Sequence, residues 1–163
     1  MPTFALEAHP DGTLTAAALT GHVWVADFIF TRCPDFCPAL SAQMAALQER
    51  LTTPVDPVHL VSFTVDPAHD TADVLRVYAA RFHAGTAWSF VTGPRDDLAR
   101  LLRDGFRVAY ADDGPPQSPI THSDRFVLVD RQLRIRGYYH GTDTTDVARL
   151  TRDALTLRAE ARS

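Results

Sequence analysis

The chain alternates between segments whose apolar residues are continuous and segments whose apolar residues recur every three or four positions. Two continuous runs, residues 23–30 and 58–65, are typical of strands that are buried on both faces of a sheet. Residues 88–91 form a shorter run of the same kind. These three segments predict the centre of a sheet, because a strand that is apolar at nearly every position has no face to turn toward water.

Helical spacing recurs in four other segments, which are residues 39–51, 70–82, 96–103 and 144–159. Apolar residues three and four positions apart lie on one face of a helix, and that face packs against the core. We therefore predict four amphipathic helices, two of them between the buried strands and two after them.

Turn signals divide the rest of the chain. Residues 4–8 and 13–18 flank Pro10-Asp11-Gly12 and predict an N-terminal β-hairpin. Residues 126–129 and 133–139 are joined by a short polar turn and predict a second antiparallel pair. Residues 111–121 hold several prolines and an Asp-Asp-Gly run, so we expect an exposed loop there.

The order of these elements predicts an α/β fold, with a central mixed sheet flanked by helices and preceded by the N-terminal hairpin. A chain of 163 residues can bury one core of ordinary size, and we expect residues 1–163 to form a single domain. The loop at residues 31–38 follows the central strand and precedes a helix. This places it at the carboxyl edge of the sheet, where α/β proteins usually carry their functional residues.

Composition narrows the function classes. The net charge is −4 and the basic residues form no stripe, so a nucleic-acid partner is not expected. The longest apolar run is far too short to cross a bilayer and contains Asp27. No signal-peptide pattern precedes the first strand, so we expect either a cytosolic protein or part of a trimmed one. The absence of lysine excludes Schiff-base chemistry, and the two methionines are too few for a methionine-rich copper site.

The chain has two cysteines, Cys33 and Cys37, and both lie in the loop after the central strand. Each precedes a proline, and Pro38 suits the first helical position, which would make Cys37 the N-cap of the next helix. The amide groups of a helix N-terminus favour negative charge and lower the pKa of a nearby thiol. The sequence therefore indicates a reactive or metal-binding pair.

Three uses of this pair stay open on local chemistry. A plain structural disulfide is poorly motivated, because so short a loop constrains the unfolded chain only weakly. Dithiol redox chemistry and metal binding have the same local signature. If a metal binds, thiolates select soft ions such as Cu(I), with Zn(II) also possible, and two cysteines need a further ligand.

Histidine is the ligand type expected to complete such a site. The chain has seven candidates, which are His9, His22, His59, His69, His83, His122 and His140. His122 differs in context, because it ends the proline-rich loop and precedes a strand, and long loops inside compact domains are often functional. On spacing alone, His122 is the most favoured of the seven candidates.

Four segments resemble, in order, the motifs of the Sco/SenC family. The first is residues 25–38 around the two cysteines, and the second is residues 65–71, where an Asp-Pro turn precedes Asp70-Thr71. The third is residues 88–93, and the fourth is Thr121-His122-Ser123 followed by the strand at residues 126–130. The match runs from about residue 4 to the final helix. Four ordered motifs are far more specific than one Cys-x-x-x-Cys.

The resemblance implies a thioredoxin-like fold and a copper site made by Cys33, Cys37 and His122. It also implies a role in assembling the binuclear copper centre of cytochrome c oxidase, at the extracytoplasmic, periplasmic side of the cytoplasmic membrane. Family members usually carry an N-terminal membrane anchor, so we expect this chain to be a trimmed form. The sequence departs from the family pattern at Gly21-His22 and after Pro38, which could alter partner docking.

Three functions follow from such a site. The first is a copper metallochaperone whose partners are the copper-centre subunit of cytochrome c oxidase and a further periplasmic copper chaperone. The second is a thiol-disulfide oxidoreductase that uses Cys33 and Cys37 to reduce the cysteines of the oxidase copper site. The third is a copper-dependent redox sensor. Whether the protein is an enzyme thus depends on which function holds, and the metallochaperone is favoured.

Three acidic residues near these motifs have structural interpretations. Asp70, together with Thr71, is expected to cap a helix, and Asp66 is expected to shape the turn before Pro67. Asp35 is interpreted as a solvent-facing docking charge. None is expected to bind the metal, because carboxylates suit Cu(I) poorly.

Overall fold

The computed structural model describes residues 1–32, 37–111 and 121–160. Within these ranges the strands are β1 (Ala5–His9), β2 (Gly12–Thr15), β3 (Trp24–Ile29), β4 (His59–Thr64), β5 (Trp88–Thr92), β6 (Tyr110–Ala111), β7 (Thr121–His122), β8 (Arg125–Val129) and β9 (Ile135–His140). The helices are α1 (Ala16–Leu19), α2 (Cys37–Leu51), α3 (Ala72–Arg81), α4 (Arg95–Arg100), the π-helical η1 (Leu101–Phe106) and α5 (Thr144–Ala159).

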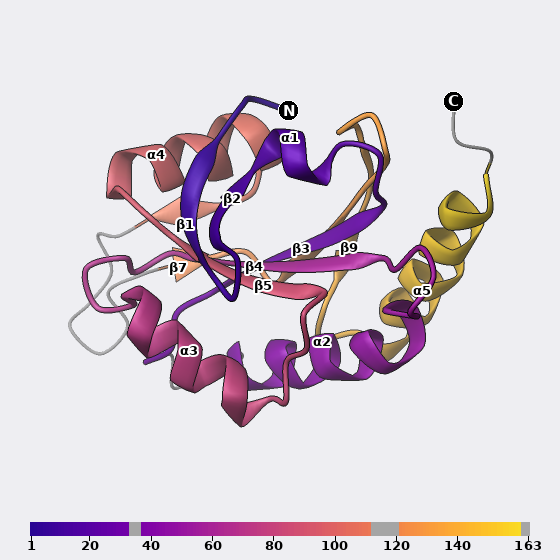
Figure 1. Cartoon of the computed structure of the whole chain (residues 1–163), viewed down its shortest axis with the longest axis horizontal. Coiled ribbons are helices and arrows are strands. Elements are labelled where there is room, and N and C mark those ends of the chain that lie inside the picture. The colour runs from indigo at the N-terminus through magenta and orange to yellow at the C-terminus, as the bar shows by residue number, and fades with distance from the viewer. Residues whose placement is uncertain (33–36, 112–120, 161–163) are drawn as a thin grey trace.

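A seven-stranded mixed sheet forms the centre of the molecule, in the order β2-β1-β5-β4-β3-β8-β9 (Figure 1). β3, β4 and β5 run parallel, whereas β8 is antiparallel to β3 and β1 is antiparallel to β5. Every residue of β3 is buried, as expected for a central strand covered on both faces. The predicted mixed sheet with an N-terminal hairpin is confirmed.

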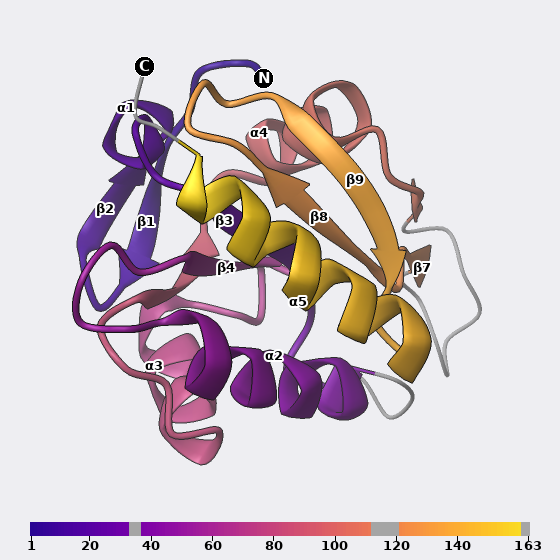
Figure 2. The ribbon, with the colours of Figure 1, turned by 90° about the vertical axis from the view of Figure 1, so that its right-hand side faces the viewer.

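Helices cover both faces of this sheet (Figure 2). On one face, the apolar residues of α2, α3 and α5 pack in one cluster with the odd-numbered residues Val25 and Ile29 of β3. On the other face, α1, α4 and η1 pack in a second cluster with the even-numbered residues Ala26 and Phe28. The alternation of side chains along β3 therefore divides the core into two halves.

Both edge regions of the sheet are antiparallel hairpins. β1 pairs with β2 and also with β5, so the N-terminal hairpin extends the parallel part of the sheet. At the other side, β8 pairs with β9, and the register shifts between Leu128 and Val129 in the manner of a β-bulge. A separate two-stranded sheet is formed by β6 and β7.

Local capping sets the ends of several helices. Thr71 accepts a hydrogen bond from the backbone of Val74 at the start of α3, and Asp143 does the same for Thr145 and Asp146 at the start of α5. Arg107 has a left-handed backbone (φ 57°) and ends η1. The helix predicted at residues 144–159 is confirmed in full.

Three predicted elements differ from the structure. The strand expected at residues 13–18 stops at Thr15, because the Thr15 side chain caps the short helix α1. The helix expected at residues 96–103 begins at Arg95 and continues through the π-helical turn η1 to Phe106. The ends of the loop expected at residues 111–121 form β6 and β7, and residues 112–120 lie outside the described residues. No described helix has the length and apolar character needed to span a membrane.

Candidate metal centre

The cysteine loop connects the buried strand β3 to helix α2. Cys33 lies outside the described residues, whereas Cys37 is the first residue of α2 and is fully buried. The helix therefore begins one residue before the predicted first position, Pro38, and Cys37 is not the N-cap. Proline is tolerated at the second helical position for the same reason as at the first, because amides of the first turn have no helical partner to lose. Cys37 therefore belongs to the first turn of α2, whose amide groups favour negative charge.

His122 is held by a different part of the molecule. It lies in β7, where it pairs with Tyr110 of β6 in antiparallel register. Both ribbon views place β7 and the N-terminal end of α2 at the same end of the molecule (Figures 1 and 2). The His122 side chain is not among those described, so the three-ligand arrangement of Cys33, Cys37 and His122 stays a prediction.

Asp70 connects the base of the cysteine loop to the sheet. Its carboxylate accepts hydrogen bonds from the Thr31 backbone N–H at 3.0 Å and from the Thr31 Oγ1 at 2.5 Å. The Thr64 Oγ1, at the carboxyl end of β4, donates to Asp70 Oδ2 at 2.7 Å. Asp70 is fully buried, and donors face both of its oxygens. It thereby fixes the backbone two residues before Cys33.

The helix-capping role predicted for Asp70 is therefore wrong. Thr71 alone supplies the cap of α3, and the Asp70 side chain points to the cysteine loop instead. Local sequence favoured the cap because an Asp-Thr pair before an apolar run is a common helix start. Its actual partner, Thr31, is 39 residues earlier in the chain.

Asp66 makes a second connection to the same loop. Its Oδ2 accepts hydrogen bonds from the Arg32 Nη2 at 2.8 Å and Nε at 3.1 Å, and its backbone N–H donates to Thr64 Oγ1 at 3.0 Å. The Arg32 side chain is 55% exposed, so this ion pair lies at the surface. The turn predicted at Asp66 is present, and the residue also pairs with the loop. Asp35 lies outside the described residues.

A buried polar cluster lies behind Cys37, between the sheet and helices α2 and α3. The Tyr78 hydroxyl is hydrogen-bonded to Ser41 Oγ at 2.7 Å. Burial raises the pKa of Tyr78, and the nearby charges of Asp27 and Cys37 raise it further. The thiol of Cys37 and the carboxyl of Asp27 therefore both lie within electrostatic range of one hydroxyl group.

Asp27 is the least expected member of this cluster. It lies in the middle of β3, is fully buried, and accepts a short hydrogen bond from Ser62 Oγ, which in turn accepts one from Trp88 Nε1 at 3.0 Å. Asp27 Oδ2 has no hydrogen-bond partner among the described residues. Burial raises the pKa of Asp27 from 3.8 to about 7, against the lowering effect of the Ser62 hydrogen bond. Its only sequence signal was a carboxylate inside an apolar run.

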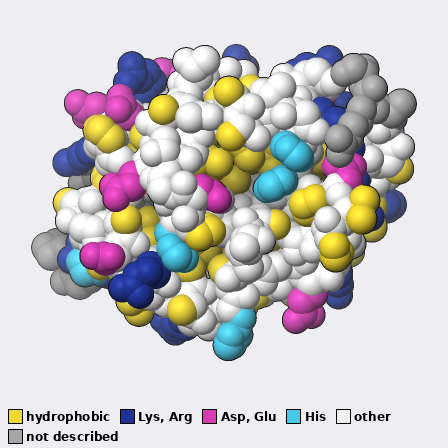
Figure 3. Space-filling view, viewed as in Figure 1, with side chains coloured by type: hydrophobic (Ala, Val, Ile, Leu, Met, Phe, Trp, Pro, Cys, Tyr) yellow, Lys and Arg dark blue, Asp and Glu magenta, His cyan; other side chains and the backbone are white. Residues whose placement is uncertain are grey.

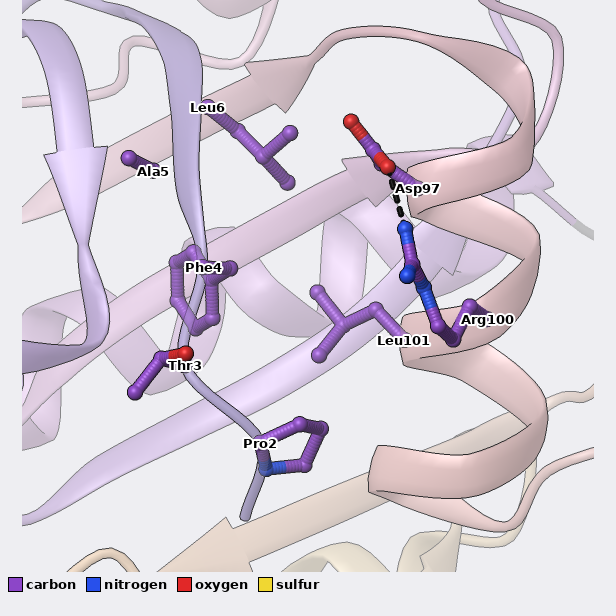
Figure 4. Close-up of a pocket in the computed structure, with 8 residues that line it drawn as sticks. All are labelled: Pro2, Thr3, Phe4, Ala5, Leu6, Asp97, Arg100 and Leu101. Carbon is purple, nitrogen blue, oxygen red and sulfur yellow. Dashed lines mark hydrogen bonds and ion pairs between the residues drawn. The ribbon is translucent and has the colours of Figure 1, made fainter.

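The described side chains include no second site with three or more metal ligands, since no group of three or more histidine, cysteine or acidic residues among them is placed to hold a metal ion. A hollow of about 360 Å³ lies between the N-terminal segment and α4, where Leu6 and Leu101 point toward each other (Figure 4). It lies on the opposite face of the sheet from Tyr78 and carries only the Asp97–Arg100 ion pair as a charged group.

Comparison with known proteins identifies the family. A family model described as SCO1/SenC matches residues 1–155. The chain belongs to the SCO1/SenC family. The expectation drawn from the four sequence motifs is thereby confirmed.

Three solved structures show the same fold. A SCO1/SenC family lipoprotein from Bacillus anthracis is 30% identical and has a TM-score of 0.87, over 96% of this chain and 94% of its own. BsSco, described as a member of the Sco family of cytochrome c oxidase assembly proteins with a disulfide switch, is 26% identical with a TM-score of 0.84, over 98% and 94%. Arabidopsis thaliana ScoI with copper bound is 24% identical with a TM-score of 0.78, over 95% of each chain. The thioredoxin-like fold predicted for the chain is confirmed.

Proposed function

We propose that this protein is a copper metallochaperone that helps to assemble the binuclear copper centre of cytochrome c oxidase, and that Cys33, Cys37 and His122 hold its copper. The observation that carries this proposal is the placement of Cys37 at the first turn of α2, at the same end of the molecule as the strand that bears His122. Membership of a family that includes BsSco and the copper-bound Arabidopsis thaliana ScoI supports it.

The donor set suits copper as cargo. Two thiolates and one imidazole are soft to borderline ligands, which match Cu(I) and are compatible with Cu(II). Each thiol must lose its proton when it binds a metal, and the amide groups of the first turn of α2 stabilise the resulting charge at Cys37. Asp70 and Asp66 bind the first two residues of the loop, Thr31 and Arg32, and so fix the backbone from which the cysteines extend.

The proposed location is the extracytoplasmic side of the cytoplasmic membrane. The Bacillus anthracis relative is a lipoprotein, which supports a membrane-associated position outside the cytoplasm. The proposed partner is the oxidase subunit that carries the copper centre, with a periplasmic copper chaperone as the source of the metal. A docking partner would have to approach the end of the molecule where β7 and the start of α2 lie.

A copper-transfer assay tests the proposal. Purified protein loaded with one equivalent of Cu(I) is mixed with the apo copper domain of the oxidase, and formation of the binuclear centre is followed by its visible absorption. We expect transfer by the wild type, and loss of copper binding after Cys33→Ser or Cys37→Ser. His122→Ala should weaken copper binding while leaving the two cysteines able to form a disulfide. Unchanged affinity in His122→Ala would contradict the three-ligand site, and His69→Ala is the matched exposed control.

A second candidate function is thiol-disulfide exchange with the cysteines of the oxidase copper site. The buried polar cluster of Asp27, Ser41 and Tyr78 behind Cys37 favours it, because such groups can stabilise or exchange a thiol proton. The disulfide switch described for BsSco also supports it. This function requires Cys33 and Cys37 but not His122. Rapid reduction of an oxidase-derived disulfide by apo protein, without detectable copper transfer, would favour it over the metallochaperone.

A further inference from the structure

Two histidines lie in contact at the other end of the central strands. His22 precedes β3 and His59 begins β4, so both are at the amino ends of parallel strands, whereas the cysteine loop follows the carboxyl end of β3. β3 has six residues, which at about 3.3 Å per residue separates the two ends by roughly 20 Å. The histidine pair is therefore independent of the proposed copper centre.

The backbone holds the two rings on one face of the sheet. His59 is in register with Trp24, and its N–H donates to the Val23 carbonyl at 3.0 Å. His22 is two residues before Trp24, so the side chains of His22 and His59 share a face. The His22 N–H is itself bonded to the Leu19 carbonyl at 3.1 Å. Each histidine thus comes from an ordered segment.

The two imidazole rings are spaced almost as one metal ion requires. Their centroids are 4.6 Å apart and their planes are inclined by 67°. Two imidazoles bound to one tetrahedral ion at metal–nitrogen distances of about 2.0–2.1 Å have centroids roughly 5 Å apart. The observed centroid distance is about half an ångström shorter than this, so binding one ion requires the rings to open slightly and to turn one nitrogen each toward it.

One nitrogen of the pair also needs a partner. His22 Nδ1 is buried and has no hydrogen-bond partner within the described part of the chain. A buried polar atom left unsatisfied costs about 1–3 kcal/mol and calls for an explanation such as an ion or a water molecule. An ion held between the rings would provide that partner.

The surroundings favour a cation that binds neutral imidazole. Burial and the neighbouring His22 lower the pKa of His59, against the opposite effect of Asp11 and Asp56, so the ring is neutral at neutral pH. A metal ligand must be neutral imidazole, and Asp11 adds negative charge nearby, whereas the charge of Asp56 is offset by its ion pair with Arg131. Asp56 is bonded to Arg131, and Asp11 to Ser89, so both are held in place. Figure 3 shows that histidine side chains reach the surface on the side of the molecule seen in that view.

We propose that His22 and His59 form a second metal site, which binds a borderline divalent ion with two imidazole nitrogens and solvent as the remaining ligands. Imidazole without thiolate suits Cu(II), Ni(II) and Zn(II), and Cu(II) binds most tightly among them. This ion would connect β3 to β4 at the amino edge of the sheet. The site does not depend on the copper centre proposed above.

Binding of Cu(II) to a protein without the cysteine site tests this directly. In a Cys33→Ser/Cys37→Ser variant we expect one equivalent of Cu(II) to bind, with nitrogen hyperfine splitting in its electron paramagnetic resonance spectrum. Adding His22→Gln or His59→Gln should weaken that binding at least tenfold. The exposed His69→Gln is the matched control and should leave it unchanged.

A second measurement locates the ion in the same cysteine-free variant. Substoichiometric Cu(II), added to the Cys33→Ser/Cys37→Ser protein, should broaden the ring proton signals of His22 and His59 before those of the other histidines. Zn(II) should raise the melting temperature of the same protein, and this rise should vanish in His59→Gln, because an ion that binds only the folded state stabilises it. Affinity unchanged by His22→Gln, or first broadening at other histidines, would overturn the proposal.

Discussion

Among the residues that the structure describes, two carboxyl groups are fully buried, and their surroundings differ. Asp70 has donors at both oxygens, from the Thr31 backbone, the Thr31 hydroxyl and the Thr64 hydroxyl. Asp27 has one side-chain donor, Ser62, and its second oxygen lacks a partner among the described residues. Equal burial therefore produces two different groups, one built as an anchor and one that retains its proton up to about pH 7.

The two carboxyl groups differ in the number of donors that face them, although both are equally buried. Donors replace the water that the charged form loses, so a fully bonded carboxylate can hold structure together. A carboxyl with an unsatisfied oxygen keeps its proton and can exchange it. Asp70 is bonded to Thr31 at the base of the cysteine loop, whereas Asp27, like Cys37, lies within electrostatic range of Tyr78.

The largest expected effect concerns Asp27 and pH. Its pKa is about 7 in the folded protein against 3.8 for an ordinary Asp, so protons bind the folded state more tightly. The stability that this contributes is fully present below pH 3.8 and is lost as the pH rises through 7. At about 1.4 kcal/mol per pH unit, the loss is on the order of 4 kcal/mol.

Urea unfolding of wild type and Asp27→Asn between pH 4 and pH 8 measures this effect. The amide does not titrate, so the difference in unfolding free energy between the two proteins should shift in favour of Asp27→Asn as the pH rises. Asp73→Asn, at a surface position, is the control and should follow the wild type. Parallel curves for wild type and Asp27→Asn would show that the unsatisfied oxygen does not set the protonation of Asp27.

Asp70→Asn is expected to have the next largest effect. The amide group replaces one acceptor with a donor, which then faces a hydroxyl or N–H that needs an acceptor. Leaving such a group unsatisfied inside the core costs about 2–3 kcal/mol. Urea unfolding at pH 7 measures the loss, with the exposed Asp104→Asn as the control. A loss below about 0.5 kcal/mol, typical of a surface substitution, would contradict the anchoring role of Asp70.

Thr31→Val tests one of the hydrogen bonds that Asp70 accepts. It removes the hydroxyl that donates to Asp70 and keeps the backbone N–H bond, so we expect a loss of about 1–2 kcal/mol. The double variant with Asp70→Asn should lose less than the sum of the two single changes, because they share one interaction. If the two losses in unfolding free energy were fully additive, Thr31 and Asp70 would not stabilise the fold through a shared interaction. Thr13→Val, at an exposed position of β2, is the matched control.

Arg32→Gln should have the smallest effect. The Arg32 side chain is more than half exposed, so its ion pair with Asp66 is screened by water and contributes less than about 1 kcal/mol. Thermal unfolding at low and high salt should show that most of this small difference disappears as ionic strength rises. A loss of stability that did not depend on salt and was as large as that of Asp70→Asn would show that Arg32 holds the loop as strongly as Asp70 does.

Sequence reasoning succeeded where the burial pattern is local and regular. The strands at residues 23–30 and 58–65 and the helix at residues 144–159 were predicted correctly, because nearly continuous or helically spaced apolar residues leave few alternatives. The cysteine loop could be placed at the carboxyl edge of the sheet for the same reason. The resemblance to the SCO1/SenC family then named the expected ligands.

What could not be predicted depends on partners far apart in the chain. Asp70 was interpreted through its neighbour Thr71, although its partner Thr31 is 39 positions away. The Ser62 that bonds Asp27 is 35 positions away, and no local pattern reveals the pairing. The short helix α1 and the π-helical turn η1 were not predicted either. The cap at Thr15 for α1, and packing against the core for η1, override weak local preferences. The histidine contact between His22 and His59 follows only from strand register.

The two outer strands of the sheet have a consequence for self-association. A long, flat outer strand offers unpaired backbone groups to any other chain and invites aggregation. Here β2 has only four residues, and β9 is irregular where it pairs with β8 and carries Arg136. Both outer strands are thus poor templates for strand addition. Association of copies through these two outer strands is therefore disfavoured, even at high local concentration.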